Sequence, residues 1–187
     1  MAELGPVPWP PAPIVTERLV LREAEARDRA GFIELFASPE VRAYLGGAQP
    51  RAELERVVPE VPGRRPGLFV AELDGAMIGT VTVDRREAGR PGHLTPDALE
   101  AELGYMFLPG AWGRGYAAEA CAAVLDWCTE VLPGEPVVLC TQSANGPSMR
   151  LAQKLGFHEV ERFEEFGAEQ WFGVRVPGAD SPQAPVT

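Results

Sequence analysis

The sequence is short of positive charge and of long apolar runs, and each shortage excludes a class of function. Acidic side chains outnumber lysine and arginine by 27 to 17, which gives a formal net charge of −10. A surface of that sign repels phosphate backbones and anionic lipid, so neither nucleic acid nor a membrane is expected as the main partner. No apolar run approaches the roughly 18 residues of a membrane-spanning helix. The N-terminus also lacks the basic and apolar regions of a secretion signal, and a cytoplasmic protein is expected.

Cysteine and histidine are scarce as well, with three and two copies. Cys121 and Cys128 lie seven residues apart in a predicted helix, about 10.5 Å along its axis, which is too far for a disulfide. There is no CxxC pair, and His93 and His158 stand apart in the sequence, so no zinc or other metal site is expected. The cysteines are interpreted as reduced core residues.

Proline gathers at the two ends of the chain, where packable residues are few. Residues 1–13 contain five prolines, and residues 177–187 read PGADSPQAPVT. Such composition is typical of disordered tails. One folded domain over residues 14–176 is therefore expected, a size that buries enough surface for a core of its own.

Hydrophobic periodicity within 14–176 predicts an alternation of strands and helices. The order is β-α-α-β-β-β-α-β-α-β-β, which indicates an α/β fold with a mixed (α+β) sheet and helices on its faces. The polar segment 84–98 is expected to be a loop at a functional edge. The strands are predicted at 18–23, 68–73, 77–83, 101–108, 137–141, 157–166 and 170–176, and the helices at 28–37, 51–58, 115–132 and 147–155.

The most informative stretch is WGRGYA at 112–117, between a predicted strand and the best predicted helix. Glycines let the backbone turn tightly and approach a ligand closely. The first amides of a helix are unpaired donors at the positive end of its dipole, so the turn is a candidate cradle for a pyrophosphate. No GK[ST] follows the glycines, which argues against a P-loop nucleotide hydrolase.

With three further motifs, the chain resembles the GNAT acyltransferase superfamily and, within it, the RimJ/RimL-like branch. The motifs are TERLVLR at 16–22, AELGY at 101–105, WGRGYAAEA at 112–120, and NGPS with KLGF between 145 and 157. The resemblance implies a single GNAT-like domain with a splayed central strand pair. It also implies an enzyme, an N-acetyltransferase that carries an acetyl group from acetyl-CoA to a primary amine by direct attack in a ternary complex. That amine belongs to a protein N-terminus or to a small molecule.

The resemblance also assigns residues to the donor substrate. Trp112 stands where the family pattern has Gln or Arg, while Gly115 and Ala117 match the pattern. Arg114 is expected at the CoA phosphates, and Asn145 at the pantetheine amide as well as at a helix cap. The expected acetyl-CoA contacts are Met106, Phe107, Trp112, Gly113, Arg114, Gly115, Tyr116, Ala117, Asn145 and Ser148.

Two residues carry the predicted chemistry. Glu102 is interpreted as a general base acting through water or as an anchor for the amine, with Glu100 as its competitor. Many relatives use a tyrosine to protonate the departing thiolate, but Ala152 occupies that position here, and Ser148 is the usual substitute in the branch. A backbone N–H around Met106 is expected to bind the oxyanion.

Alternatives remain at this stage. Another donor such as succinyl-CoA fits the same motifs, and so does a non-catalytic CoA-binding sensor module. The helices at 28–58 and the loop at 84–98 are expected to shape the acceptor pocket, but their residues carry no code for the amine acceptor. A homodimer is suggested by the resemblance alone.

Overall fold

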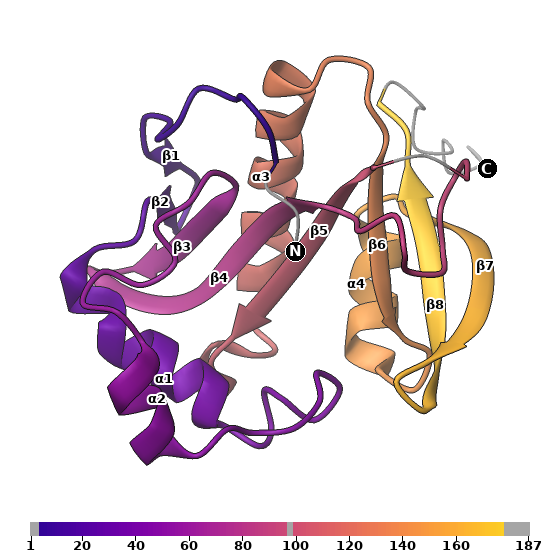
Figure 1. Ribbon diagram of the computed structural model, residues 1–187. Coiled ribbons are helices and arrows are strands. Elements are labelled where there is room, and N and C mark those ends of the chain that lie inside the picture. Colours follow the sequence, from indigo (N-terminus) through magenta and orange to yellow (C-terminus); the bar gives the residue numbers. More distant parts are fainter. Residues whose placement is uncertain (1–3, 97–98, 178–187) are drawn as a thin grey trace, which may run out of the picture.

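The computed structural model describes residues 4–96 and 99–177, which form one twisted eight-stranded mixed sheet with four α-helices (Figure 1). The strand order is β1-β2-β3-β4-β5-β6-β8-β7, so the predicted mixed-sheet fold class is confirmed. The strands are β1 Ile14–Val15, β2 Val20–Arg22, β3 Leu68–Leu73, β4 Ala76–Arg85, β5 Ala101–Phe107, β6 Val137–Gln142, β7 His158–Glu165 and β8 Ala168–Arg175. The helices are α1 Arg29–Ala37, α2 Arg51–Val57, α3 Tyr116–Val131 and α4 Gly146–Lys154.

Local sequence explains where these elements begin and end. The β3–β4 hairpin turns at Asp74 and Gly75, which both have positive φ (50° and 81°), the requirement of a tight two-residue turn. The β7–β8 hairpin turns in the same way at Phe166 and Gly167. Helix α3 forms because its apolar residues recur at helical spacing, and its buried positions include Cys121, Leu125 and Cys128.

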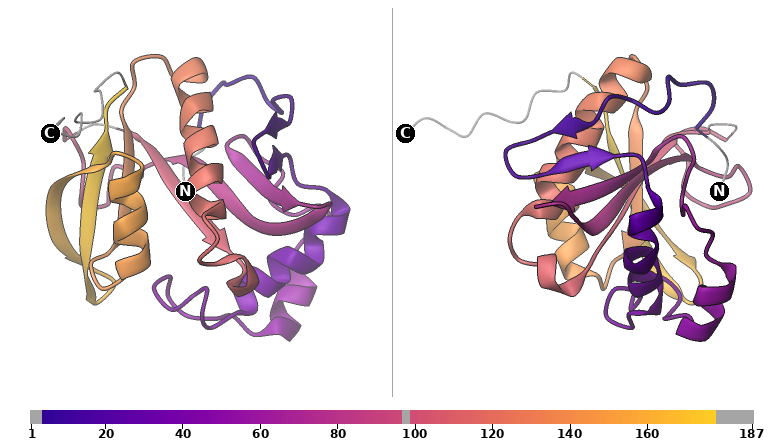
Figure 2. Two further views of the ribbon diagram at one scale, coloured as in Figure 1. Left: turned by 180° about the vertical axis from the view of Figure 1, so that it is seen from behind. Right: turned by 90° about the vertical axis from the view of Figure 1, so that its left-hand side faces the viewer.

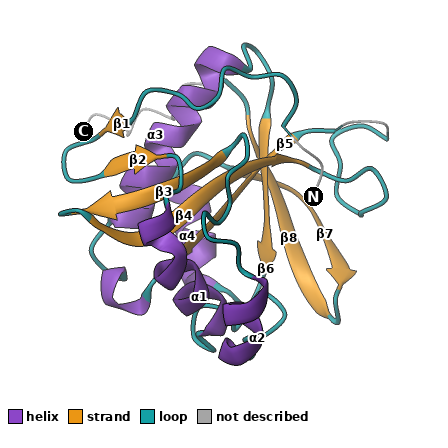
Figure 3. Ribbon diagram, turned by 60° about the vertical axis from the view of Figure 1, so that its left-hand side comes forward, coloured by secondary structure: helices purple, strands orange, loops and turns teal. Residues whose placement is uncertain are grey.

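The helices cover opposite faces of the sheet (Figures 2 and 3). Helices α3 and α4 pack on one face and close the main core. Helices α1 and α2 lie on the other face, where Phe32 of α1 packs with Leu68 and Val70 of β3. The main core includes Phe69, Val81, Leu103, Leu125 and Leu139.

The sheet separates at its centre. Strands β5 and β6 run parallel, but their ladder holds only Ala101 with Val137 and Glu102 with Val138. Beyond this point β6 pairs along its full length with β8, while β5 stays with β4. The two strands therefore part from Leu103 onward, in agreement with the splayed pair that the resemblance implied.

The N-terminal segment differs from the expected disordered tail. Leu4 is 1% exposed, and the Trp9 ring makes edge contacts with the rings of Phe69 and Trp127 at 5.0 and 6.0 Å. The proline content predicts a disordered tail. Burial of these two large apolar side chains outweighs the entropy cost of ordering the segment. Residues 1–3 and 178–187, the outer parts of the predicted tails, lie outside the described residues.

Within residues 4–96 and 99–177, no helix combines the length and the apolar character needed to cross a bilayer. The same ranges contain no group of three His, Cys, Asp or Glu side chains arranged for a metal ion. All three cysteines are free thiols, and burial raises the pKa of the Cys140 thiol to about 11.

Candidate active site

One cavity of about 590 Å³ occupies the gap between β5 and β6. Its walls come from both strands, the loop and first turn of α3, helix α4, and residues Glu40, Val41, Tyr44 and Leu45 after α1. The cavity therefore has two ends, one at the start of α3 and one at the segment 40–45. The predicted site residues that line it are Met106, Phe107, Trp112, Gly113, Gly115, Tyr116, Ala117, Asn145 and Ser148.

The glycine loop forms the α3 end of the cavity. Gly113 and Gly115 have φ of 72° and 81°, in the left-handed region that L side chains rarely adopt. Gly115 is the N-cap of α3, so the unpaired amides of the first helical turn begin directly after it. The Trp112 indole N–H donates to the Phe107 carbonyl at 2.7 Å and fixes the loop on the end of β5. That contact gives Trp112 a structural role at a position where the family pattern has Gln or Arg.

The start of α3 is held by the N-terminal strand region. Thr16 donates to the Glu119 carboxylate at 2.6 Å, and the Arg18 guanidinium donates to it at 2.7 Å and to the Arg114 carbonyl at 2.9 Å. Burial alone raises the pKa of Glu119, but these donors outweigh burial and hold that pKa below its ordinary value. Glu119 thus fixes the helix, while the Arg114 side chain is exposed and does not line the cavity.

The hydrogen-bond ladder decides which β5 backbone groups face the gap. Leu108 N–H donates to the Ile78 carbonyl at 2.9 Å, beside the pairing of Thr80 with Met106. Backbone groups alternate along a strand, so Met106 turns its N–H toward β4 as Leu108 does.

The odd-numbered residues of β5 turn their backbone groups the other way, toward the gap. Leu103, Tyr105 and Phe107 lie where the β5–β6 ladder has ended, and the Phe107 carbonyl is already bonded to Trp112. The N–H groups of Tyr105 and Phe107 therefore point into the cavity region. Because of this alternation, the amides of Tyr105 and Phe107 can pair with a ligand that lies along β5 like an added strand, whereas the Met106 amide faces β4.

Ser148 and Asn145 stand at the start of α4. The Asn145 side chain accepts from the Ser148 N–H at 3.2 Å, which is the cap predicted from the sequence. The Ser148 hydroxyl is hydrogen-bonded to the Tyr105 hydroxyl across the cavity wall. Burial raises the pKa of Tyr105 to about 12, so this phenol stays protonated at neutral pH. No spacing rule joins positions 43 residues apart, so the sequence alone does not predict the pairing of Tyr105 with Ser148.

Glu102 lies apart from this hydroxyl pair. Its carboxylate pairs with Arg86 at 2.7 Å and with Arg90 at 3.7 Å, and it does not line the cavity. Arg86 is fully buried, lies over the Phe172 ring at 5.0 Å, and donates to the carbonyls of Pro91 and Gly92 at 2.5 Å. Glu102 is thus part of an ion-pair network that fixes the loop after β4.

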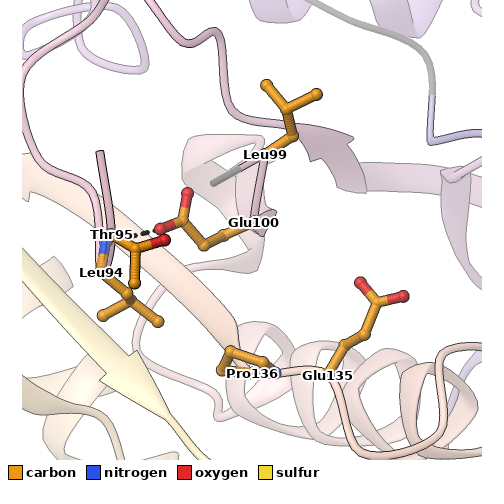
Figure 4. Close-up of a pocket in the computed structure, with 6 residues that line it drawn as sticks. All are labelled: Leu94, Thr95, Leu99, Glu100, Glu135 and Pro136. Carbon is orange, nitrogen blue, oxygen red and sulfur yellow. Dashed lines mark hydrogen bonds between the residues drawn. The ribbon is translucent and has the colours of Figure 1, made fainter. Parts of the chain in front are cut away.

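Glu100, the competitor, points into a different pocket (Figure 4). Its carboxylate accepts from the Leu94 N–H at 2.5 Å and contacts the His93 ring at 2.8 Å. Burial raises the pKa of Glu100, but these partners outweigh burial and lower that pKa overall. Glu100 organises the 87–96 loop and is separated from the central cavity.

Arg150 and Lys154 of α4, which bring positive charge to the lining, were missed from the sequence. Residues 40, 41, 44 and 45 also line the cavity, and they lie within the region 28–58 that was expected to shape the acceptor pocket. The α4 cations follow helical spacing and were therefore detectable once the cavity-facing side of α4 was known. Segment 40–45 has no such pattern.

Comparisons with known proteins agree with this geometry. A family model described as an acetyltransferase (GNAT) domain matches residues 18–158. The uncharacterized protein YkkB of Bacillus subtilis is 31% identical over 156 residues, covering 78% of this chain and 84% of that protein. The L-amino acid N-acetyltransferase AaaT of Escherichia coli is 28% identical over 146 residues, covering 76% and 84%.

A solved structure shares the fold. Mycobacterium smegmatis RimJ in complex with CoA-disulfide superposes with a TM-score of 0.63 at 21% identity, covering 90% of this chain and 88% of that one. The family match spans both the glycine loop and the separated strands, which are the two features that build the cavity. The chain therefore belongs to the GNAT acetyltransferase family, and it is an acyl-CoA-dependent acetyltransferase whose co-substrate is acetyl-CoA.

Proposed function

We propose that this enzyme is an N-acetyltransferase of the RimJ/RimL-like branch that acetylates a primary amine, either a protein N-terminus or a small amine, by direct attack in a ternary complex. The observation that carries the proposal is the continuity of the cavity through the β5–β6 gap. Donor and acceptor enter from opposite ends of one space and meet beside the β5 backbone. Such an arrangement places two reactants in contact without a covalent enzyme intermediate.

The donor substrate fits the α3 end. The loop glycines leave open space, since a Cβ at Gly113 would meet nothing within 4 Å. The first amides of α3 suit a pyrophosphate, and Arg150 and Lys154 add positive charge along the same wall. Pantetheine pairs with the backbone of Tyr105 and Phe107 in this proposal, and Asn145 lies beside it.

The chemistry requires a donor for the carbonyl oxygen and a proton for the thiolate. An N–H of Tyr105 or Phe107 stabilises the negative charge that develops on the carbonyl oxygen. Ser148 donates the proton to the departing thiolate, and Tyr105 orients the Ser148 hydroxyl through their hydrogen bond.

The amine must lose its proton before or during attack. Glu102 is engaged by two arginines and stands outside the cavity lining, so we assign it a positioning role on the wall rather than direct proton abstraction. Water in the open cavity then takes the proton, and the rate follows the fraction of free amine.

Two measurements test the proposal. Acetyl-CoA at 100 times its dissociation constant adds about 2.7 kcal/mol to the free energy of unfolding, which a thermal shift detects. Release of free thiol from acetyl-CoA, followed across N-terminal peptides, amino-acid amides, polyamines and aminoglycosides, reports turnover. A thermal shift with no thiol release for any amine contradicts the proposed transfer and indicates a CoA-binding sensor.

A further inference from the structure

The acceptor end of the cavity is formed by large apolar side chains. Val41, Tyr44 and Leu45 come from the loop after α1, and Met106 joins them from β5. Tyr44 and Leu45 are 38% and 45% exposed, although side chains of this size are normally buried. The Tyr44 carbonyl accepts from the Gln142 side chain at 3.3 Å, which ties this loop to the end of β6 (Figure 1). Partly exposed apolar side chains therefore line this end of the cavity.

Three carboxylates on the α1 face of the sheet are already paired with arginine. Asp84 pairs with Arg65, Glu102 with Arg86, and Glu165 with Arg90, and none of the three acids lines the cavity. A carboxylate already paired with arginine offers little to a second cation, because that cation must displace the first.

The charged residues of the lining itself are few. Glu40 is its one acid among the described residues, and its exposed carboxylate accepts from the Ser38 hydroxyl at 2.9 Å. Arg150 and Lys154 belong to the donor wall in the proposed function, so Glu40 is the one charged side chain of the lining left to the acceptor. Among the described residues, the other acids that give the net charge of −10 lie outside the lining.

We infer that the acceptor is a primary amine that carries a single apolar side chain, and that polyamines and aminoglycosides are poor substrates. The inference rests on the proposed N-acetyltransferase function and names its substrate class. The apolar substituent lies against Val41, Tyr44 and Leu45, while its amino group reaches the β5–β6 gap.

The test compares acceptors that differ in the side chain alone. With acetyl-CoA saturating, leucinamide and phenylalaninamide are expected to show kcat/KM about tenfold above glycinamide, since covering most of such a side chain is worth that factor. Spermidine and ribostamycin are expected to fall below leucinamide. Thiol release measures all five acceptors under one condition.

Variants test whether the segment 40–45 causes the preference for an apolar acceptor. Leu45→Asn preserves size but adds polarity, and it is expected to remove most of the advantage in kcat/KM that leucinamide has over glycinamide, while the KM of acetyl-CoA stays within twofold. Val41→Thr is expected to act in the same direction with a smaller effect. Val57→Asn is the matched control, because Val57 is an exposed apolar residue of α2, 62% exposed, that does not line the cavity.

Several results overturn the inference. A kcat/KM for spermidine or ribostamycin above that of leucinamide does so, and so does equal use of glycinamide and leucinamide. An equal loss for every acceptor in Leu45→Asn means that the loop only supports the fold. These failures leave transfer itself intact, whereas thiol release from none of the amines contradicts the proposed function and removes this inference with it.

Discussion

The two ends of the central cavity are built in different ways. The donor end is made of backbone: positive-φ glycines, the first amides of α3, and the β5 amides left open by the separated ladder. The acceptor end is made of side chains from a loop with no regular structure, set against a sheet face whose acids are paired with arginines.

This difference in construction explains how one fold can retain the same donor substrate while its amine acceptor varies. Backbone recognition of a pyrophosphate depends on a local turn that few residues can form, so the donor end tolerates little variation. Side chains on an irregular loop can be replaced without altering the core, so the acceptor end sets specificity. Variants that alter one end of the cavity alone test whether the donor end and the acceptor end act separately.

The largest effect is expected from Gly115→Val at the donor end. A β-branched residue at φ 81° is strained, and its Cβ would meet the Arg18 guanidinium at 3.4 Å, so the turn that presents the helix amides to a phosphate is expected to shift. Loss of two charge-assisted hydrogen bonds weakens CoA binding by about 100-fold or more. Calorimetric titration with CoA measures the affinity, and circular dichroism measures the melting temperature in parallel. An affinity within twofold of the parent shows that the loop is a steric turn only.

Ser148→Ala is expected to lower kcat by about 100-fold with little change in CoA affinity, because the departing thiolate loses its proton donor. The helix cap survives, since Asn145 accepts from the Ser148 backbone N–H, which alanine retains. An acyl donor with a more acidic leaving thiol is expected to shrink the defect. A defect independent of the leaving group argues that Ser148 only positions the donor.

Glu102→Gln is expected to affect stability more than chemistry. It leaves buried Arg86 without its carboxylate, and breaking such a pair costs about 3–5 kcal/mol. The kcat is expected to fall by about tenfold or less, with an unchanged pH profile. Glu165→Gln is the matched control, since it removes a partner of Arg90 and leaves the Arg86–Glu102 pair intact. A loss of 100-fold or more that recovers at high pH, at an unchanged melting temperature, restores Glu102 as the base.

The smallest effect is expected from Tyr105→Phe. It removes the hydroxyl that orients Ser148 and keeps the ring in the wall, so kcat is expected to fall by about threefold to tenfold. Because burial raises the pKa of Tyr105 to about 12, the phenol stays protonated below that pH, and the parent and variant share one pH profile between pH 6 and 10. A new ionisation in that range in the parent alone contradicts the positioning role. The double variant with Ser148→Ala is expected to be no worse than Ser148→Ala itself.

Much of the fold follows from local sequence. Predicted strand 68–73 agrees with β3, and the predicted long helix 115–132 agrees with α3 to within one residue at each end. The Asp-Gly turn and the helix-opening glycines were recognisable because positive φ restricts which residues fit. Composition was less informative at the N-terminus, where Leu4 and Trp9 pack into the core despite their proline-rich surroundings.

The sequence by itself determined the fold class, the glycine loop, the capping role of Asn145 and the choice of acetyl-CoA, since each depends on residues adjacent in the chain or on a resemblance carried by local motifs. Only the tertiary structure decided the partners of Glu102, the pairing of Tyr105 with Ser148, and the apolar acceptor end. These contacts join residues far apart in the chain, and their occurrence depends on how β5 and β6 separate. Hydrophobic periodicity does not predict that separation, because the separation arises when β5 pairs with β4 and β6 pairs with β8.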